Sequence, residues 1–188
     1  MLDAAEELFY AQGIAATGVD AVLRRAQVAP ATLYAHFAGK DHLVAAYLQR
    51  RHERWLGVWD DVLERCGDDP VERALSVFVA LDEMPLPREA ARGCAFLGAA
   101  VEITDADHPA HAWLLADTRL LTDRLRALAA DAGAADPDAL AAELLLLYDG
   151  ALAARRRRAT TGDGPPAAPV RDLAAAAVDR SREERRRL

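Results

Sequence analysis

Cysteines, aromatic side chains and long apolar runs are all scarce in this chain of 188 residues. The two cysteines, Cys66 and Cys94, stand apart, which argues against a disulfide framework or a C-x-x-C zinc ribbon. The most apolar run, from Leu140 to Tyr148, is interrupted by Glu143 and is far shorter than the roughly 20 residues of a membrane span. The acidic N-terminus is also unlike a signal peptide. We therefore expect a cytoplasmic protein without a membrane partner.

The amino acids that are abundant favour helices. Hydrophobic residues make up 52% of the chain and charged residues 28%, as in a globular protein with an apolar core. Alanine and leucine dominate and aromatic residues are only 6%, so strand formers are in short supply. The net charge of −7 argues against a protein that coats nucleic acid, but it allows a local DNA-binding face. The composition predicts an all-α fold.

Helix starts and ends are indicated by apolar spacing together with proline, glycine and aspartate. Pro30 stands at the favoured first turn of a short helix, and Asp69-Pro70 and Asp136-Pro137 each combine an N-cap with a first-turn proline. Thr17 is expected to cap another short helix, with Asp20 three residues on. These signals predict about nine helices, no strand and a linker at 160–169. The helices are expected at about 2–12, 17–26, 30–37, 41–66, 70–83, 88–103, 108–132, 137–158 and 170–187.

The segment 13–43 carries the strongest functional pattern. Two short helices joined by a turn of about four residues form a helix-turn-helix, whose second helix has small and polar side chains suited to a major groove. The stretches 13–19 (GIAATGV), 28–37 (VAPATLYAHF) and 40–43 (KDHL) closely resemble the N-terminal domain of the TetR family of bacterial transcriptional regulators. The resemblance covers about the first 47 residues, and the helical remainder also fits the family.

This resemblance implies a helix-turn-helix DNA-binding domain at residues 1–46 and a helical effector-binding and dimerisation domain at 47–188. In physical terms, the N-terminus of the helix after Thr17 offers backbone amides to a phosphate. Small residues at the start of the helix from Pro30 let its backbone approach base edges, and outward polar side chains and the only lysine can bind phosphates. The predicted DNA-binding residues are Thr17, Gly18, Pro30, Ala31, Thr32, Tyr34, His36 and Lys40.

Some features favour a plainer interpretation. Taken singly, each predicted residue could be a helix cap or a solvated side chain. Gln27 stands where the family turn commonly has glycine. Ala29 replaces the usual serine N-cap, and the loss of this cap costs about 1 kcal/mol of helix stability. Residues 1–50 carry four basic side chains against five acidic ones, and no basic residue precedes the first helix. The alternative function is therefore a helical small-molecule-binding protein with weakened or lost DNA binding.

Large side chains spread over several predicted helices could line a cavity for a small-molecule effector, which we expect to be largely apolar. Ordinary core packing is the alternative for each of them. The predicted ligand-binding residues are Trp55, Trp59, Phe78, Cys94, Phe96 and Trp113. His108 and His111 lie beside acidic residues, but their spacing fits no specific metal site. We expect no metal and no cofactor, and a capping role for Asp107 or His108.

The last two predicted helices are expected to form a homodimer interface. One carries an apolar stripe and the other a small apolar face, which together permit a four-helix contact between two subunits. The predicted interface residues are Leu140, Leu144, Tyr148, Leu152, Leu173 and Ala177. The run Arg155–Arg158 is interpreted as a solvated helix end, where positive charge suits the helix dipole.

Motifs for enzyme chemistry are absent from the sequence. It has no G-x-G-x-x-G, no complete phosphate loop, no H-E-x-x-H and no nucleophile elbow, so we do not expect an enzyme. We predict a homodimeric transcriptional regulator, a repressor whose two recognition helices bind a palindromic operator in double-stranded DNA. An effector in the helical domain would favour a dimer geometry that no longer matches the spacing of the half-sites.

Overall fold

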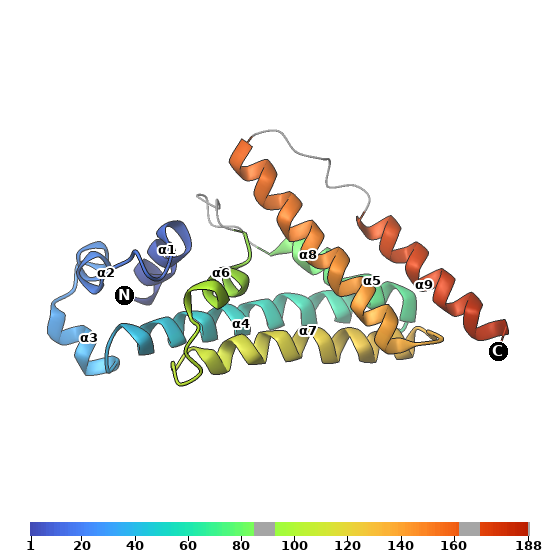
Figure 1. Ribbon diagram of the computed structural model, residues 1–188, viewed down its shortest axis with the longest axis horizontal. Helices are drawn as coiled ribbons and strands as arrows, with labels where there is room; N and C mark the ends of the chain where they lie inside the picture. The colour runs from blue at the N-terminus through green and yellow to red at the C-terminus, as the bar shows by residue number, and fades with distance from the viewer. Residues whose placement is uncertain (85–92, 162–169, 188) are drawn as a thin grey trace. The chain divides into compact units, whose positions relative to one another are not determined.

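The computed structural model describes residues 1–84, 93–161 and 170–187 (Figure 1). Within these ranges the chain forms nine α-helices and no strand, which confirms the all-α prediction. No helix in the described ranges is both long enough and apolar enough to cross a membrane. The helices are α1 (Leu2–Gln12), α2 (Val19–Ala26), α3 (Pro30–His36), α4 (Lys40–Arg65), α5 (Pro70–Glu83), α6 (Ala95–Glu102), α7 (His111–Asp131), α8 (Pro137–Thr161) and α9 (Val170–Arg187).

Two predicted N-caps are confirmed. The Asp69 carboxylate accepts hydrogen bonds from the backbone N–H groups of Val71 and Glu72, at 2.9 and 3.2 Å, and Pro70 is the first residue of α5. Asp136 caps α8 in the same way, through the N–H groups two and three residues further on. Both caps satisfy backbone donors that the helix itself leaves without partners.

The capping role predicted for Thr17 is wrong. The helix α2 begins at Val19, and its N-cap is Gly18. The Thr17 side chain is fully buried, and its hydroxyl donates to the backbone carbonyl of Gly13 at 2.7 Å. The hydroxyl therefore stabilises the turn between α1 and α2, because a buried polar group is best satisfied by the nearest backbone acceptor.

Two later helices begin further along the chain than predicted. The helix α6 begins at Ala95, and the start predicted near Arg88 falls among residues 85–92, outside the described residues. The helix α7 begins at His111. It follows a turn in which the Nδ1 atom of His108 accepts the backbone N–H of Ala110 at 3.0 Å, so the imidazole stabilises the approach to α7.

The described chain divides into two compact units, each with its own apolar core. The first unit consists of Met1–Arg54 and the described part of Leu86–Asp117. The second consists of the described parts of Trp55–Pro85 and Thr118–Leu188. The helices α4 and α7 therefore contribute to both units. The predicted boundary after residue 46 separates two functions, DNA binding and effector binding, and it stays a prediction.

The core of the first unit collects side chains from α1, α2, α3, the first part of α4, and α6. Leu33 of α3 and Leu43 of α4 are fully buried in it. The rings of Phe9 and Tyr47 pack against each other with their centroids 5.7 Å apart. Burial of Leu33 fixes which side of the short helix α3 turns inward, because a buried leucine contributes about 1.5–3 kcal/mol.

The core of the second unit is built around tryptophans. Trp59 is fully buried, and its Nε1 atom donates to the Ser76 hydroxyl at 2.8 Å. Trp55 packs between Trp59 and Tyr148, with ring centroids 5.7 Å away in each case. The helix α9 lies against α8 and α5 (Figure 1).

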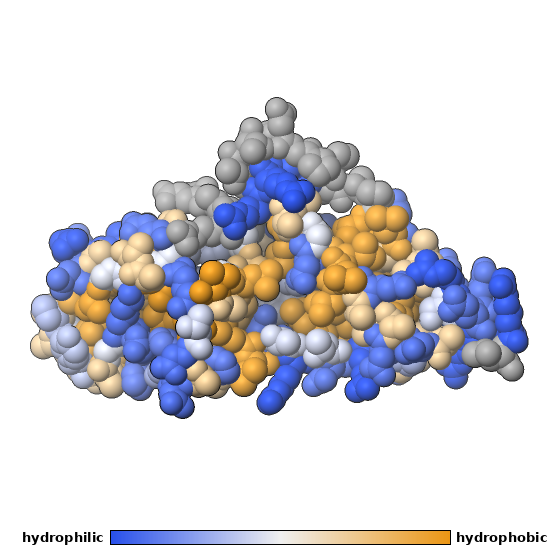
Figure 2. Space-filling view, viewed as in Figure 1, coloured by the Kyte–Doolittle hydropathy of each residue, from blue (hydrophilic) through white to orange (hydrophobic). Residues whose placement is uncertain are grey.

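Four of the six predicted dimer residues are buried inside the second unit itself: Leu140, Leu144, Tyr148 and Ala177. Their side chains pack within the subunit rather than project toward a partner, because apolar spacing marks a buried face without saying what buries it. Leu152 is half-buried, whereas Leu173 is exposed. Leu146 and Leu173 are the large apolar residues exposed on α8 and α9. Figure 2 shows apolar side chains at the surface where these two helices lie.

Candidate nucleic-acid interface

The short helix α3 has one buried face and one exposed face. Leu33 is fully buried and Phe37, the residue that ends the helix, is half-buried. Tyr34 is 67% exposed, and Ala31 and His36 are also exposed. The free face of α3 thus presents small and polar side chains, as a helix that enters a major groove requires.

The turn between α2 and α3 forms without the glycine and the serine that the family commonly has there. Gln27 has a φ of 56°, in the left-handed region that glycine occupies at lower cost. Ala29 is the N-cap of α3 and contributes no side-chain hydrogen bond, so the predicted loss of the cap is confirmed. Pro30 is exposed at the first position of the helix, and Thr32 is half-buried.

The N-terminus of α2 is the place predicted for a phosphate. Gly18, its N-cap, is exposed and lacks a side chain that could occupy the helix end. Thr17 is buried directly before it, so its hydroxyl does not reach the surface. Thr17 therefore positions the backbone at this helix end rather than offering a donor to DNA.

Lys40 is the first residue of α4, which begins one residue before the predicted start at Asp41. It is half-buried, and its Nζ atom donates to the backbone carbonyl of Ala15 at 3.4 Å, a long hydrogen bond. The ammonium group is held beside the turn that leads into α2. A weak contact of this kind can be exchanged for a phosphate oxygen, which bears a full negative charge.

Two further cations of this region, Arg25 and Arg50, are engaged with acidic side chains. Arg25 pairs with Glu7 at 2.6 Å, with both side chains about half exposed. Arg50 pairs with Asp3 at 2.5 Å, and the Arg50 guanidinium holds the pKa of that carboxyl below its ordinary value. An exposed pair such as Arg25–Glu7 contributes little and can give way to a phosphate. Few counterions would be released on binding, so we expect a shallow salt dependence.

A buried carboxylate that the sequence did not single out ties α1 to α4. Glu6 has a side chain only 12% exposed, and it receives hydrogen bonds from Arg54, at 2.7 Å, and from Arg50. The Arg51 guanidinium lies 3.6 Å from the same carboxylate. Burial by itself raises the pKa of Glu6, but the arginines outweigh burial and hold this pKa below its ordinary value.

Three of the residues predicted to line an effector cavity, Trp55, Trp59 and Phe78, belong to the second unit and are buried. The ring of Trp59 is covered by the Arg124 guanidinium at 4.9 Å from its centroid, and Arg124 pairs with Asp60 at 2.7 Å. These contacts are those of a packed core. An effector site among them stays a prediction.

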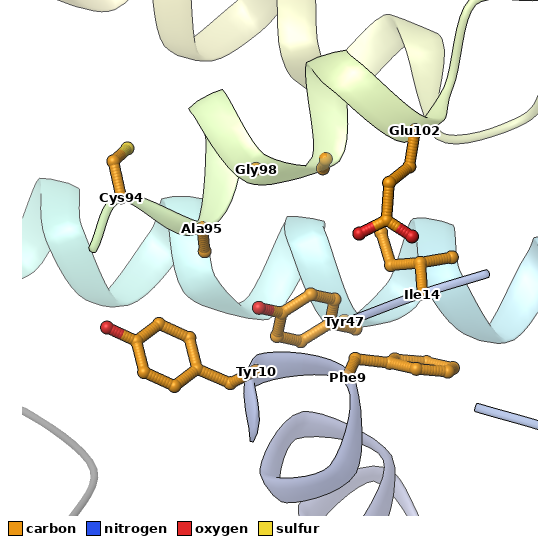
Figure 3. Close-up of a pocket in the computed structure, with 9 residues that line it drawn as sticks. Phe9, Tyr10, Ile14, Tyr47, Cys94, Ala95, Gly98 and Glu102 are labelled. Atoms are coloured by element: carbon orange, nitrogen blue, oxygen red, sulfur yellow. The ribbon is translucent and has the colours of Figure 1, made fainter. Parts of the chain in front are cut away.

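The other three, Cys94, Phe96 and Trp113, belong to the first unit. His52 of α4 packs against both Phe96 and Trp113, with ring centroids 6.4 and 5.8 Å away. Burial lowers the pKa of His52 and raises the pKa of the Cys94 thiol, so it favours the uncharged form of each. Cys94 also lines a small cavity, shown in Figure 3.

The histidines near the start of α7 serve the turn that precedes it. The Nε2 atom of His108 lies 3.4 Å from the Asp41 carboxylate, while its Nδ1 atom accepts the Ala110 N–H described above. His111 opens α7 and is half-buried. Among the described residues, no three His, Cys, Asp or Glu side chains are grouped as metal ligands.

Comparisons with known proteins give a consistent picture. Residues 1–47 match the sequence model of the bacterial regulatory proteins of the tetR family. A TetR-family transcriptional regulator from Streptomyces coelicolor is 31% identical and has a TM-score of 0.80, over 97% of this chain and 92% of that one. A TetR-type transcriptional regulator from Streptomyces avermitilis is also 31% identical, with a TM-score of 0.75 over 96% and 94% of the two chains. A TetR-family regulator from Cytophaga hutchinsonii, only 14% identical, shares the fold with a TM-score of 0.76, over 96% and 92%. No curated protein sequence matches the chain.

Proposed function

Because this chain belongs to the TetR family of bacterial regulatory proteins, we propose that it is a homodimeric repressor that binds a palindromic operator and releases it when an effector binds. A DNA-binding transcriptional regulator is what the family supports directly. The sign of regulation, the dimer, the symmetry of the operator and the response to an effector are the proposal.

The observation that carries DNA binding is the division of α3 into two faces. Leu33 is fully buried while Tyr34, the next residue, is 67% exposed, so the core fixes the rotation of the helix about its axis. A side chain that points outward from a helix with small neighbours can reach a phosphate when the helix lies in a groove. Tyr34, His36 and Lys40 are the proposed phosphate ligands.

The proposed dimer uses the outer faces of α8 and α9. Leu146 is 72% exposed and Leu173 54% exposed, and burial of both in a partner contact would remove them from water. Ala142 and Gly150 lie one turn to either side of Leu146, are also exposed, and are small enough to admit a second helix. We expect Leu146→Glu to shift the protein from dimer to monomer in analytical ultracentrifugation, and Leu115→Glu, on α7, to leave the mass unchanged.

Effector release is proposed as a shift between two dimer geometries. Two recognition helices bind one operator only if their separation matches the half-site spacing of about 34–36 Å. An effector changes this equilibrium by the difference between its affinities for the two geometries. The tryptophan-rich second unit is the proposed location of a largely apolar effector.

The test of DNA binding uses DNA from the promoter region of the protein's own gene, titrated at two salt concentrations. We expect saturable binding that is selective over a shuffled fragment. Lys40→Ala should weaken binding to every sequence and reduce the salt slope by about 1 per subunit. The matched control is Arg171→Ala, which removes an exposed cation that pairs with Glu72 in the second unit. Equal weakening by both variants would show a general charge effect and remove Lys40 from the interface.

A second candidate function, a helical small-molecule-binding protein with weakened DNA binding, is favoured by the charges around α3. Arg25 and Arg50 are already paired with acidic side chains, and Ala29 offers no cap to α3. Binding that is weak and indifferent to sequence, for a protein that includes any natural residues before Met1, would favour this candidate over the repressor.

A further inference from the structure

The face of α3 that is free to enter a major groove consists mainly of small apolar groups. Ala31 and Ala35 are both exposed and lie four residues apart, so their methyl groups share one side of the helix. Tyr34 lies on the same side and is 67% exposed. The ring of Pro30, at the start of the helix, is also exposed. A base pair that meets this face therefore meets mainly hydrocarbon.

The side chains that identify bases by paired hydrogen bonds are absent from α3. Guanine is read by arginine or lysine, adenine by asparagine or glutamine, and cytosine by a carboxylate. The seven residues of α3 include none of these types. Thr32 is half-buried, and a single hydroxyl bonds to several bases without distinguishing them. The remaining group that a base presents in the major groove is the C5 methyl of thymine, which apolar side chains contact.

Longer polar side chains stand near α3 but on other parts of the motif. Arg24 and Arg25 are exposed at the end of α2, and Gln27 is exposed in the turn that follows. The first helix of a helix-turn-helix crosses the phosphate backbone, whereas the N-terminal part of the second helix meets the base edges. Ala31 is the second residue of α3 and belongs to that part. Position as well as composition favours Ala31 over these longer side chains as the residue that meets the bases.

On the basis of the DNA-binding function proposed above, we propose that this chain recognises its operator through thymine methyl groups, which pack against the methyl groups of Ala31 and Ala35. Four residues of an α-helix span about 6 Å, and successive bases lie about 3.4 Å apart. The two alanines therefore contact thymines about two base steps apart. Phosphate contacts from Tyr34, His36 and Lys40 hold α3 in the groove but carry no sequence information.

The test is uracil interference on the promoter fragment used for the DNA titration. Uracil pairs as thymine does but lacks the C5 methyl group. Fragments that carry occasional uracils are separated into bound and free fractions, and uracil-specific cleavage then locates the uracils. We expect uracil at two or more thymines of each half-site to be depleted from the bound fraction, with a loss of affinity of about fourfold for each methyl group. Selective binding without any depleted thymine would overturn the proposal.

Replacement of purine N7 atoms is the matched control on the DNA side. 7-Deazaguanine and 7-deazaadenine lack the N7 acceptor to which arginine, lysine, asparagine and glutamine donate. We expect neither replacement to change the affinity when it is made within the half-sites. A loss larger than the loss caused by uracil would assign the readout to Arg24, Arg25 or Gln27 and overturn the proposal.

The matched variants on the protein side are Ala31→Gly and Ala127→Gly, because Ala127 is exposed on α7 in the second unit and glycine destabilises either helix. We expect Ala31→Gly to weaken binding to the thymine fragment about fourfold more than binding to the uracil fragment. Ala127→Gly should affect both fragments equally. The double-mutant cycle cancels any effect on the helix itself, so equal weakening of both fragments by Ala31→Gly would also overturn the proposal. If the wild-type chain bound no fragment selectively, the repressor function itself would be wrong and this proposal with it.

Discussion

The second unit buries Trp59, the largest fully buried side chain of the described residues, in a core of aromatic and aliphatic contacts. In the first unit, the link between α1 and α4 adds a buried carboxylate, Glu6, surrounded by guanidinium groups. Apolar packing depends little on pH, whereas a buried ion network loses its energy when one member is neutralised. The stability of the unit that carries α3 is therefore expected to respond more strongly to pH than that of the second unit.

The largest effect is expected from Trp59→Ala in the second unit. The substitution removes a fully buried ring and leaves the Ser76 hydroxyl without its donor, so we expect a loss of about 4 kcal/mol in the free energy of unfolding. Urea denaturation followed by circular dichroism measures it. Trp59→Phe should cost clearly less. Equal losses for both variants would mean that the indole hydrogen bond, rather than the volume of the ring, holds this core.

A slightly smaller loss is expected from Glu6→Ala in the first unit. It leaves the buried Arg51 without a counter-charge, and removing one partner of a buried pair costs about 3 kcal/mol. Glu7→Ala, which breaks only the exposed pair with Arg25, is the matched control and should change stability by less than about 1 kcal/mol. If the two variants were equally stable, the buried network around Glu6 would not stabilise the first unit, and the proposed contrast with the apolar core of the second unit would be wrong.

The pH dependence should separate the units further. The folded-state pKa of Glu6 is lowered, so its contribution to stability is present above its ordinary pKa of 4.5 and is lost as the pH falls below that value. The pKa of His52 is also lowered, by burial, so its contribution begins to fall already below pH 6.5. We expect acid to destabilise the first unit before the second. Amide exchange at pH 7, at pH 5 and below pH 4 measures this, because the contribution of Glu6 is lost only below pH 4.5. A uniform loss of protection in both units would contradict it.

The smallest effects concern helix caps and should be opposite in sign. Asp69→Ala removes a cap with two hydrogen bonds and should destabilise the protein by about 1 kcal/mol. Ala29→Ser supplies a cap that α3 lacks, at a residue whose backbone is already extended, and should stabilise it by up to about 1 kcal/mol. Thermal melting of the two variants provides the comparison. If Ala29→Ser left the melting temperature unchanged, the new hydroxyl would not reach the N–H groups of α3.

Local signals in the sequence were sufficient for much of the fold. Asp69 and Asp136 act within three residues of themselves, so their caps could be predicted without knowledge of the rest of the chain. Thr17 has the same local signature, but the Gly13 carbonyl takes its hydroxyl, and that competition depends on how the turn is packed. The sequence marked Gln27 only as a departure from the usual turn glycine, and the structure shows that Gln27 itself adopts the positive φ.

Longer-range features could not be predicted in the same way. Glu6 and Arg54 are 48 residues apart, and a charge on α1 has no local mark that distinguishes a buried partner from solvent. The apolar positions of Trp59 and Phe96 indicated burial, but periodicity does not say which of two cores a side chain joins. The same ambiguity led Leu144 to be interpreted as an interface residue, although its own subunit buries it.

The backbone of Ala15 is held on both sides of its Cα atom, its N–H by Glu102 of α6 and its carbonyl by Lys40 of α4. The amide hydrogen of Ala15 exchanges with solvent only in moments when the Glu102 carboxylate lets go, so its exchange rate counts those moments. A phosphate that draws Lys40 away would free the carbonyl without touching the N–H. The exchange rate of the Ala15 amide therefore measures, without any label, the stability of the contact between the end of α6 and the turn before α2.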